Sequence, residues 1–337
     1  MIERLKVYYP SPKLGLYPRG VSQQAKQVLF ATLDPSIDFI VDEEMPDPAD
    51  YQILVAGRPT EEQLNASPNL HTVVIPWAGV VEETLNLLRE YPHIAVYNLH
   101  HNASTTAESA LMLLLAASKQ ILPIECRFRE NDWTLRYGPS TAVSLYGKTI
   151  LLLGFGYVGQ HIARASQGMG MKIVVIRRDA NAPVPEDIQA EVYPAEDLHI
   201  QLPRANVLMV TLPLTGETEG MIGKEEINLL PPNAILVNVG RGPVVDQETL
   251  YQALKDKRLH SAGIDVWYNY PQDEDSRANT PPADYPFHEL ENVVMSPHRG
   301  GGAMDVEILR MEHLAHLLNT AAKGEPIPNR VDLTRGY

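Results

Sequence analysis

The residues that decide the fold are Thr149-Ile-Leu-Leu-Leu-Gly154-Phe-Gly156-Tyr-Val-Gly159, and the stretch Gln160-His-Ile-Ala-Arg-Ala-Ser-Gln167 follows them. The apolar run is typical of a buried strand, and the stretch after Gly159 is typical of a helix. A GxGxxG pattern alone is weak evidence, but at a strand-to-helix turn it predicts a dinucleotide-binding fold. We expect Gly154 to permit the turn, Gly156 to let a pyrophosphate approach the backbone, and Gly159 to let helix and strand pack closely. The alternative is a glycine-rich turn without a ligand.

The end of the next strand bears on the choice of cofactor. The helix after the glycine-rich turn would point the N–H groups of its first residues toward the cofactor phosphates. Tyr157 and Val158, which lie between the glycines, are among these residues. NAD-binding folds place an acid about 20 residues after the fingerprint, where it holds the ribose 2′-hydroxyl. Here Arg177 and Arg178 stand at that point, followed by Asp179. Because a guanidinium can pair with a 2′-phosphate, the sequence favours NADP(H) over NAD(H). The alternative is that both arginines face solvent and Asp179 serves the ribose.

Short β-branched apolar runs recur on both sides of this turn, with helix-like stretches between them. Such near-continuous apolar strands indicate parallel sheets covered by helices on both faces, an α/β architecture. The expected strands are Leu5–Tyr9, Ile37–Val41, Ile53–Val55, Val73–Ile75, Ile94–Val96, Ile150–Leu153, Ile173–Ile176, Val207–Val210, Ala234–Val237, Ala262–Val266 and Val293–Met295.

The length of 337 residues predicts about two domains. Between the two sets of strands lies Ser104–Ala117, the stretch with the strongest helical pattern, which would form the crossover between domains. Thr105 and Glu108 make a capping-box pattern, so the helix is expected to begin there. The acidic, proline-rich segment 268–285 is expected to be a long loop beside a functional site, or an insertion.

The composition excludes several functions. The 28 basic and 42 acidic residues give a formal net charge of −14, which fits poorly with a binder of nucleic acid or anionic membranes. The longest apolar run, 110–117, is far shorter than the roughly 20 residues that span a bilayer. The segment 1–10 lacks the apolar core of a secretory signal and is expected to be a first strand. With Cys126 as the single cysteine, we expect no internal disulfide, no thiolate metal site and a cytoplasmic location.

Three later segments carry polar residues where buried strands end. They contain Arg241, Asp265 and His298. Ligands of open α/β sheets bind beyond the carboxyl ends of the strands, so these side chains can converge there. An arginine suits a carboxylate, and a histidine suits proton exchange near neutral pH. Taken singly, each residue has a plain structural alternative: a surface cation, a helix cap and a loop histidine.

Together these segments resemble the D-isomer-specific 2-hydroxyacid dehydrogenase family, of the glyoxylate/hydroxypyruvate reductase type. The resemblance runs from about Ile53 to Arg330. Four blocks match in order and spacing: Leu212-Pro-Leu-Thr-Gly-Glu-Thr218, Leu230-Pro-Pro-Asn-Ala-Ile-Leu-Val-Asn238, Val239-Gly-Arg-Gly-Pro-Val-Val-Asp246 and Asn292-Val-Val-Met-Ser-Pro-His298. The resemblance implies two doubly wound parallel-sheet domains. A Rossmann nucleotide-binding domain, residues 103–301, would be inserted into a flavodoxin-like substrate domain, residues 1–102 and 302–337.

The resemblance also implies roles for single residues. Arg241 would clamp the carboxylate of a small 2-ketoacid, and His298 would protonate its carbonyl oxygen as the D-2-hydroxyacid forms. Asp265 would lie near the nicotinamide. The candidate substrate-binding residues are Trp77, Ala78, Gly79, Val80, Asn102 and Arg241, the turn 77–80 offering an anion nest. The candidate cofactor-binding residues are Gly154, Gly156, Tyr157, Val158, Gly159, Arg177, Arg178, Pro213, Thr218, Asp265 and His298.

The sequence departs from the family at the partner of the histidine. Most members carry a glutamate that hydrogen-bonds it, whereas Tyr270 stands there in this chain. A carboxylate raises a histidine pKa above its usual value of about 6.5, and a neutral phenol hardly does. The acidic run 273–275 could replace the missing carboxylate, but a solvated loop is the favoured interpretation. We therefore expect the pKa of His298 to be lower than in acid-bearing relatives.

Two other functions stay open. One is a dehydrogenase of another small acid such as formate, because formate dehydrogenases of the family also lack the acid. The other is a nucleotide-sensing binding protein, because some relatives act as corepressors. No metal site is expected, since His100 and His101 lack acidic or thiolate partners at ligand spacing. The aromatic-rich stretch 128–146, with Trp133 and Tyr137, is a candidate homodimer contact.

Overall fold

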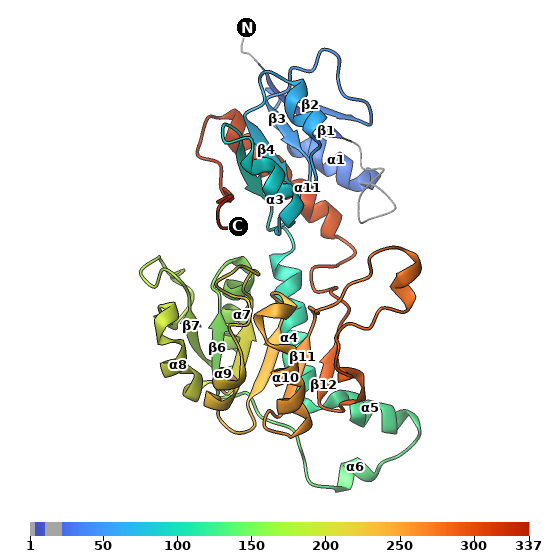
Figure 1. The fold of residues 1–337 in the computed structure, drawn as a ribbon, viewed down its shortest axis with the longest axis vertical. Coiled ribbons are helices and arrows are strands. Elements are labelled where there is room, and N and C mark those ends of the chain that lie inside the picture. The colour runs from blue at the N-terminus through green and yellow to red at the C-terminus, as the bar shows by residue number, and fades with distance from the viewer. Residues whose placement is uncertain (1–3, 11–21, 337) are drawn as a thin grey trace. The chain divides into compact units, whose positions relative to one another are not determined.

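The computed structural model describes residues 4–10 and 22–336, and these form two compact units. The first contains Met1–Asn102 and Ala303–Tyr337, and the second contains Ala103–Gly302. The second boundary therefore falls one residue after the expected one. Residues 1–3, expected to open the first strand, lie outside the described residues. Each unit is a parallel sheet with helices around it (Figure 1).

The first unit has a five-stranded sheet in the order β2-β1-β3-β4-β5, with every pair parallel. This is the flavodoxin-like order expected from the sequence. Its strands are β1 (Leu5–Pro10), β2 (Ile37–Asp42), β3 (Ile53–Val55), β4 (Thr72–Ile75) and β5 (Ala95–Asn98). Its helices are α1 (Gln23–Thr32), α2 (Glu61–Ala66), α3 (Glu82–Arg89) and α11 (Val306–Ala322).

The second unit has a seven-stranded parallel sheet in the order β12-β11-β10-β9-β6-β7-β8. Counted from β6, this is the Rossmann order 3-2-1-4-5-6 with one further strand at the edge. Its strands are β6 (Thr149–Leu153), β7 (Lys172–Ile176), β8 (Ala190–Tyr193), β9 (Val207–Val210), β10 (Ile235–Asn238), β11 (Ser261–Ile264) and β12 (Val293–Met295). Its α-helices are α4 (Ala103–Lys119), α5 (Ile121–Arg129), α6 (Thr134–Tyr137), α7 (Tyr157–Gly168), α8 (Leu198–Gln201), α9 (Lys224–Leu229) and α10 (Gln247–Lys255).

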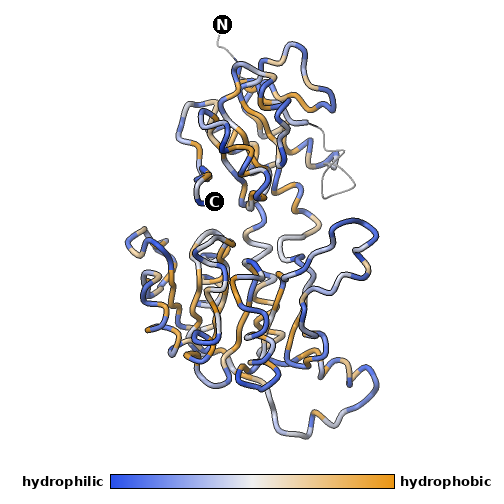
Figure 2. The backbone as a smooth tube through the Cα atoms, in the orientation of Figure 1, coloured by the Kyte–Doolittle hydropathy of each residue, from blue (hydrophilic) through white to orange (hydrophobic). Residues whose placement is uncertain are grey.

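Both faces of this second sheet are covered, as the continuous apolar strands predict. Along β6, Ile150 and Leu152 pack with residues of α4 and α7, whereas Leu151 and Leu153 pack with residues of α8, α9 and α10. All four side chains are fully buried, so successive residues of one strand supply two separate cores. Figure 2 shows the same pattern, with hydrophobic strands inside hydrophilic loops.

One strand was not expected from the sequence, and the expected start of one helix is wrong. The edge strand β8 was not predicted, because its sequence Ala-Glu-Val-Tyr is short and half exposed, without a continuous apolar run. Helix α4 begins at Ala103, so Thr105 lies inside its first turn and not at its N-cap. Ala103 is itself buried and belongs to the buried stripe of the helix, so tertiary packing extends the helix past the local cap signal.

Helix α4 packs closely against the sheet of the second unit. A Cβ added at Gly263 in β11 would lie 2.7 Å from Cβ of Leu113, so the helix reaches the strand only because this position is glycine. Among the described residues, no single helix has the length and apolar character to cross a membrane; α4 and α5 pass such a test only as a pair bent by 71°.

Candidate active site

The glycine-rich turn between β6 and α7 has the geometry that a dinucleotide needs. Gly154 has φ +96°, a conformation that favours glycine. A Cβ on Gly159 would lie 2.5 Å from the carbonyl oxygen of Gly154, whereas one on Gly156 would meet no described atom within 4 Å. Gly156 is also the N-cap of α7, and glycine has no side chain to occupy the first N–H groups. The turn therefore fits a phosphate at an open helix N-terminus.

The two arginines after β7 differ in what they contact. The guanidinium of Arg177 donates to the carbonyl oxygens of Ala180, Ala182 and Pro183, and it lies 5.6 Å from the ring centre of Phe155. Arg177 therefore holds the loop 180–183. Arg178 is more exposed, and its Nη2 lies 2.5 Å from Oε2 of Glu217. Asp179 accepts a hydrogen bond from the backbone of Asn181 at 3.0 Å, within the same turn.

Pro213 and Thr218 lie in the loop that follows β9. The Thr218 hydroxyl donates to the carbonyl oxygen of Pro213 at 2.6 Å and accepts from the backbone N–H of Thr215 at 2.9 Å. Thr218 is 8% exposed. Its side chain therefore fixes the shape of the loop that carries Glu217, a residue that sequence reasoning did not single out.

Arg241 lies in a loop whose backbone is held by two hydrogen bonds to the side chain of Asn238. The side chain of Asn238 donates to the carbonyl oxygen of Arg241 at 2.9 Å and accepts from the N–H of Gly240 at 3.1 Å. The Arg241 guanidinium donates to the carbonyl oxygen of Gly240 at 2.7 Å. Burial lowers the pKa of Arg241 and the nearby Tyr270 raises it, while the guanidinium stays a cation. A half-buried cation with fixed backbone is suited to bind a carboxylate.

Asp265 shapes the loop that carries His298. Its carboxylate accepts hydrogen bonds from the backbone N–H of Arg299 at 2.9 Å, from that of Gly300 at 2.8 Å and from the Ser296 hydroxyl. Asp265 is only 2% exposed, so these bonds replace the water that a buried carboxylate loses. Asp265 is thus a positioning residue for His298, and its expected place near the nicotinamide stays a prediction.

Tyr270 and His298 form a hydrogen-bonded pair. The distance from Tyr270 Oη to His298 Nδ1 is 2.9 Å, and Oη also accepts from the backbone N–H of Trp267 at 3.1 Å. His298 has φ +55°, which is uncommon for a residue with a side chain and is held here by the Asp265 contacts. The sequence predicts that Tyr270 takes the place of the family glutamate, and its hydroxyl lies within hydrogen-bond distance of the imidazole.

The surroundings of His298 lower its pKa. Desolvation by neighbouring protein atoms lowers it most, the positive charge of Arg241 lowers it further, and Asp265 raises it in part. A phenol can accept from a protonated Nδ1 and donate to an unprotonated one, so it does not favour the imidazolium as a carboxylate would. The acids Asp273 and Glu274 bond within their own loop, to the backbone of Ser276 at 2.8 Å and to Arg277 at 2.7 Å. Neither contact joins these acids to His298, and a pKa lower than in acid-bearing relatives stays a prediction.

The substrate-binding candidates 77–80 and Asn102 belong to the first unit. Residues 77–80 follow β4 and are half-buried. The carbonyl oxygen of Ala78 accepts a hydrogen bond from the side chain of Asn98 at 2.6 Å. A Cβ on Gly57 would lie 1.9 Å from Cη2 of Trp77, so the indole rests on a glycine backbone. Asn102 lies in the turn directly before α4.

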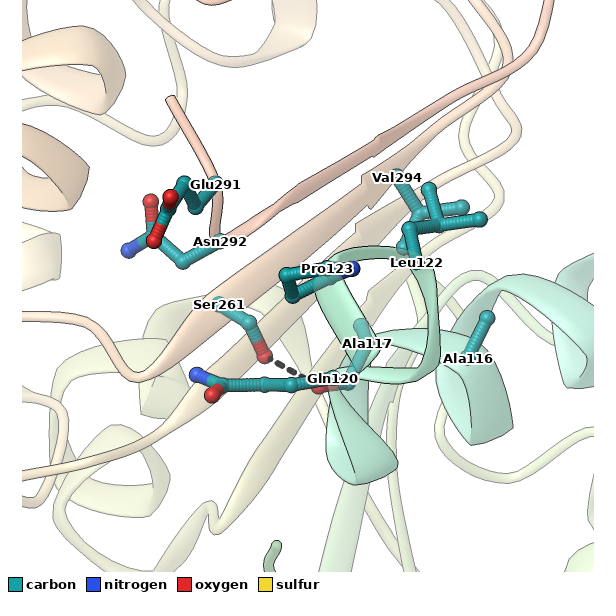
Figure 3. Close-up of a pocket in the computed structure, with 9 residues that line it drawn as sticks. All are labelled: Ala116, Ala117, Gln120, Leu122, Pro123, Ser261, Glu291, Asn292 and Val294. Atoms are coloured by element: carbon teal, nitrogen blue, oxygen red, sulfur yellow. Dashed lines mark hydrogen bonds between the residues drawn. The ribbon is translucent and has the colours of Figure 1, made fainter. Parts of the chain in front are cut away.

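The small cavity between α4, α5 and the edge of the second sheet is not a candidate active site. A cavity of about 10 Å³ lies where α4 and α5 meet β11 and β12, and there Ser261 donates to the carbonyl oxygen of Ala117 at 3.0 Å (Figure 3). This volume suffices for about one water molecule and not for a ketoacid. Within residues 4–10 and 22–336, no three His, Cys, Asp or Glu side chains lie close enough to hold a metal ion.

Comparison with known proteins identifies the family. Residues 111–300 match the family model described as D-isomer specific 2-hydroxyacid dehydrogenase, NAD binding domain. The chain belongs to this family. The glyoxylate reductase of Korarchaeum cryptofilum is 34% identical over 230 residues, 68% of this chain and 66% of that protein. The family resemblance expected from the sequence is thus confirmed.

Other members of the 2-hydroxyacid dehydrogenase family match over different spans. The D-3-phosphoglycerate dehydrogenase of Methanocaldococcus jannaschii is 27% identical over 85% of this chain and 52% of its own length. A D-isomer specific 2-hydroxyacid dehydrogenase from Xanthobacter autotrophicus Py2, solved in complex with NADPH and MES, has a TM-score of 0.76 at 25% identity. That match covers 99% of this chain and 100% of that structure. The chain spans just under two thirds of the length of the glyoxylate reductase that it matches.

Proposed function

We propose that this 2-hydroxyacid dehydrogenase homologue is an NADPH-dependent reductase that converts a small 2-ketoacid of the glyoxylate or hydroxypyruvate type into the D-2-hydroxyacid. The observation that carries the proposal is the pair Tyr270–His298, joined at 2.9 Å, together with the charge of Arg241 acting on both rings. All three belong to the unit that holds the dinucleotide turn. The glyoxylate reductase name of a relative supports the same reaction.

In this proposal Arg241 binds the substrate carboxylate. Its guanidinium can accept a bidentate carboxylate, and the Asn238 contacts fix the backbone from which it extends. Desolvation around the side chain strengthens an ion pair formed there. Trp77, Ala78, Gly79, Val80 and Asn102 stay predicted substrate-binding residues, and the turn 77–80 would offer backbone N–H groups to an anion.

His298 supplies the proton. Reduction of a ketone adds a hydride to carbon and a proton to oxygen, so one acid must face the carbonyl oxygen. With Nδ1 held by Tyr270, the protonated ring presents its Nε2–H to that oxygen and becomes neutral when the proton leaves. Tyr270 remains hydrogen-bonded to the ring before and after transfer, so it acts here as a positioning residue.

The cofactor would be held by the open N-terminus of α7 and by the residues around it. NADPH supplies the hydride when bound. Gly156, Tyr157 and Val158 would face its pyrophosphate, and Arg178 would face its 2′-phosphate. The NADPH complex of the similar protein from Xanthobacter autotrophicus supports this choice.

A homodimer and a cytoplasmic location complete the proposal. The stretch 128–146 exposes large apolar side chains: Trp133 is 57% exposed, Tyr137 84% and Tyr146 80%. Such clustering is typical of a surface that another chain covers. Light scattering of the purified protein, before and after Trp133→Ser, tests the dimer. The single exposed Cys126 is compatible with a reducing compartment.

The test of the reaction is a set of initial rates with NADPH and NADH over glyoxylate, hydroxypyruvate, pyruvate and phenylpyruvate. We expect the highest kcat/KM with NADPH as the cofactor and either glyoxylate or hydroxypyruvate as the substrate. Binding of cofactor without turnover of any ketoacid would favour a nucleotide sensor. Turnover of formate with no rate on glyoxylate would favour a formate enzyme.

A further inference from the structure

The ion pair between Arg178 and Glu217 joins two loops at the cofactor end of the Rossmann sheet. Arg178 lies two residues after β7, where a Rossmann fold binds the group on the ribose 2′ position. Glu217 comes from the loop after β9. Their side chains are 45% and 73% exposed and meet at 2.5 Å, Nη2 to Oε2.

We propose that Glu217 sets the cofactor selectivity by competing with the 2′-phosphate for Arg178. This inference rests on the proposed function, in which Arg178 binds NADPH. A carboxylate on the guanidinium occupies donors that the phosphate needs. The 2′-phosphate of NADPH must therefore compete with Glu217 for the guanidinium, whereas NADH, with a neutral hydroxyl at that position, leaves the ion pair in place.

Hydrogen bonds hold the backbone around Arg178 and Glu217, so only their side chains need to move when a 2′-phosphate competes with Glu217. Arg177 anchors its loop through three carbonyl contacts, and its own N–H donates to the carbonyl oxygen of Tyr193 at 3.1 Å. Buried Thr218, next to Glu217, is tied to Pro213 and Thr215. The ion pair can therefore part by rotation of these two exposed side chains, without movement of either backbone.

Removal of the Glu217 carboxylate has three expected consequences for binding. Loss of the carboxylate removes a competitor and a like charge, so NADPH binds more tightly. For an exposed pair the expected gain is about 2- to 5-fold in Kd, because solvent screens such pairs. NADH gains no affinity, because its 2′-hydroxyl carries no charge for the carboxylate to repel. The gain in NADPH affinity also shrinks as salt rises.

A binding experiment on the intact protein tests this without relying on turnover. Kd values for NADPH, NADH and 2′,5′-ADP are measured by fluorescence or calorimetry for the unaltered chain, Glu217→Gln, Arg178→Gln and the double variant. Glu219→Gln is the matched control. Glu219 is also exposed, and its substitution removes the same charge two residues away from Glu217. Thermal melting shows that each variant is folded.

We expect Glu217→Gln to tighten NADPH and 2′,5′-ADP by about 2- to 5-fold more than Glu219→Gln does, with no tightening of NADH and no effect in the Arg178→Gln background. Equal effects of Glu217→Gln and Glu219→Gln, or weaker NADPH binding in Glu217→Gln, overturn the inference. In that outcome the proposed function still stands if the unaltered chain reduces glyoxylate with NADPH. If the unaltered chain binds no NADPH, the proposed function itself fails.

Discussion

Replacing Tyr270 by glutamate tests how the neutral phenol sets the proton chemistry of His298. The phenol oxygen lies 2.9 Å from Nδ1, so the shorter glutamate side chain would place its carboxylate about 4–6 Å from the imidazolium, close enough to shift its pKa. An opposite charge that close raises a histidine pKa by about 1–3 units, and partial exposure of the site, with Tyr270 40% exposed, places the expected rise near the lower end.

The direction of the pH effect follows from the protonation state of His298 that reacts. Reduction needs the protonated imidazole, which is lost as the pH rises through the pKa of His298. Burial and Arg241 lower that pKa below 6.5 in the unaltered chain, so the rate of reduction should already fall before neutral pH. In Tyr270→Glu the same fall should come about one pH unit later, which corresponds to about 1.4 kcal/mol.

The assay is the pH profile of kcat/KM for glyoxylate reduction between pH 5 and 9. Tyr270→Gln is the matched control, because it keeps a polar side chain without the charge and should not move the fall to higher pH. NMR titration of the His298 ring signals measures the same pKa without turnover. A profile of the unaltered chain that stays flat to about pH 8, or identical profiles for the glutamate and glutamine variants, would refute the reasoning.

Three further changes test the site and its support. Arg241→Gln should reduce kcat/KM about 10²-fold, from a loss of about 3 kcal/mol in a charged hydrogen-bonded pair, with NADPH Kd unchanged; an equal loss in NADPH binding would contradict the clamp. Asp265→Asn should lower the free energy of unfolding by about 2–3 kcal/mol and slow turnover, because an amide cannot accept from every donor that now bonds the carboxylate; denaturant melts measure this, and an unchanged stability would count against it. Gly159→Ala should cost about 1–3 kcal/mol through the clash at 2.5 Å, whereas Gly156→Ala should melt normally and bind NADPH more weakly; the reverse pattern in melting and titration would be inconsistent with the assigned roles.

The sequence predicted the features that depend on local pattern. The glycine turn and the eleven expected strands follow from glycine spacing and apolar runs, because buried parallel strands must be apolar on both faces. The strand order of the two sheets was expected from the family resemblance, and the structure has that order. Strand β8 escaped prediction because an edge strand need not be apolar. The start of α4 was predicted wrongly because the burial of Ala103 outweighed the capping pattern at Thr105.

Parts of the site depend on contacts between distant segments, which no local pattern encodes. Arg178 and Glu217 are 39 residues apart, and Tyr270 and His298 are 28 apart. The family resemblance predicted that Tyr270 contacts His298, because Tyr270 stands where most members carry the glutamate that hydrogen-bonds the histidine. Glu217 lies in one of the quoted family blocks, but the sequence does not show that it contacts Arg178. Nor does it show that Arg177 bonds its own loop while Arg178 stays exposed.

The central claim is that His298 delivers the proton in an NADPH-dependent reduction, and single-turnover kinetics test it most directly. NADPH absorbance is followed after mixing the loaded protein with glyoxylate, for the unaltered chain and for His298→Asn. Because a positioned general acid contributes about 10²- to 10⁴-fold, the variant should bind NADPH as before and oxidise it slower by that factor. Oxidation at the same rate in both proteins would contradict the assignment.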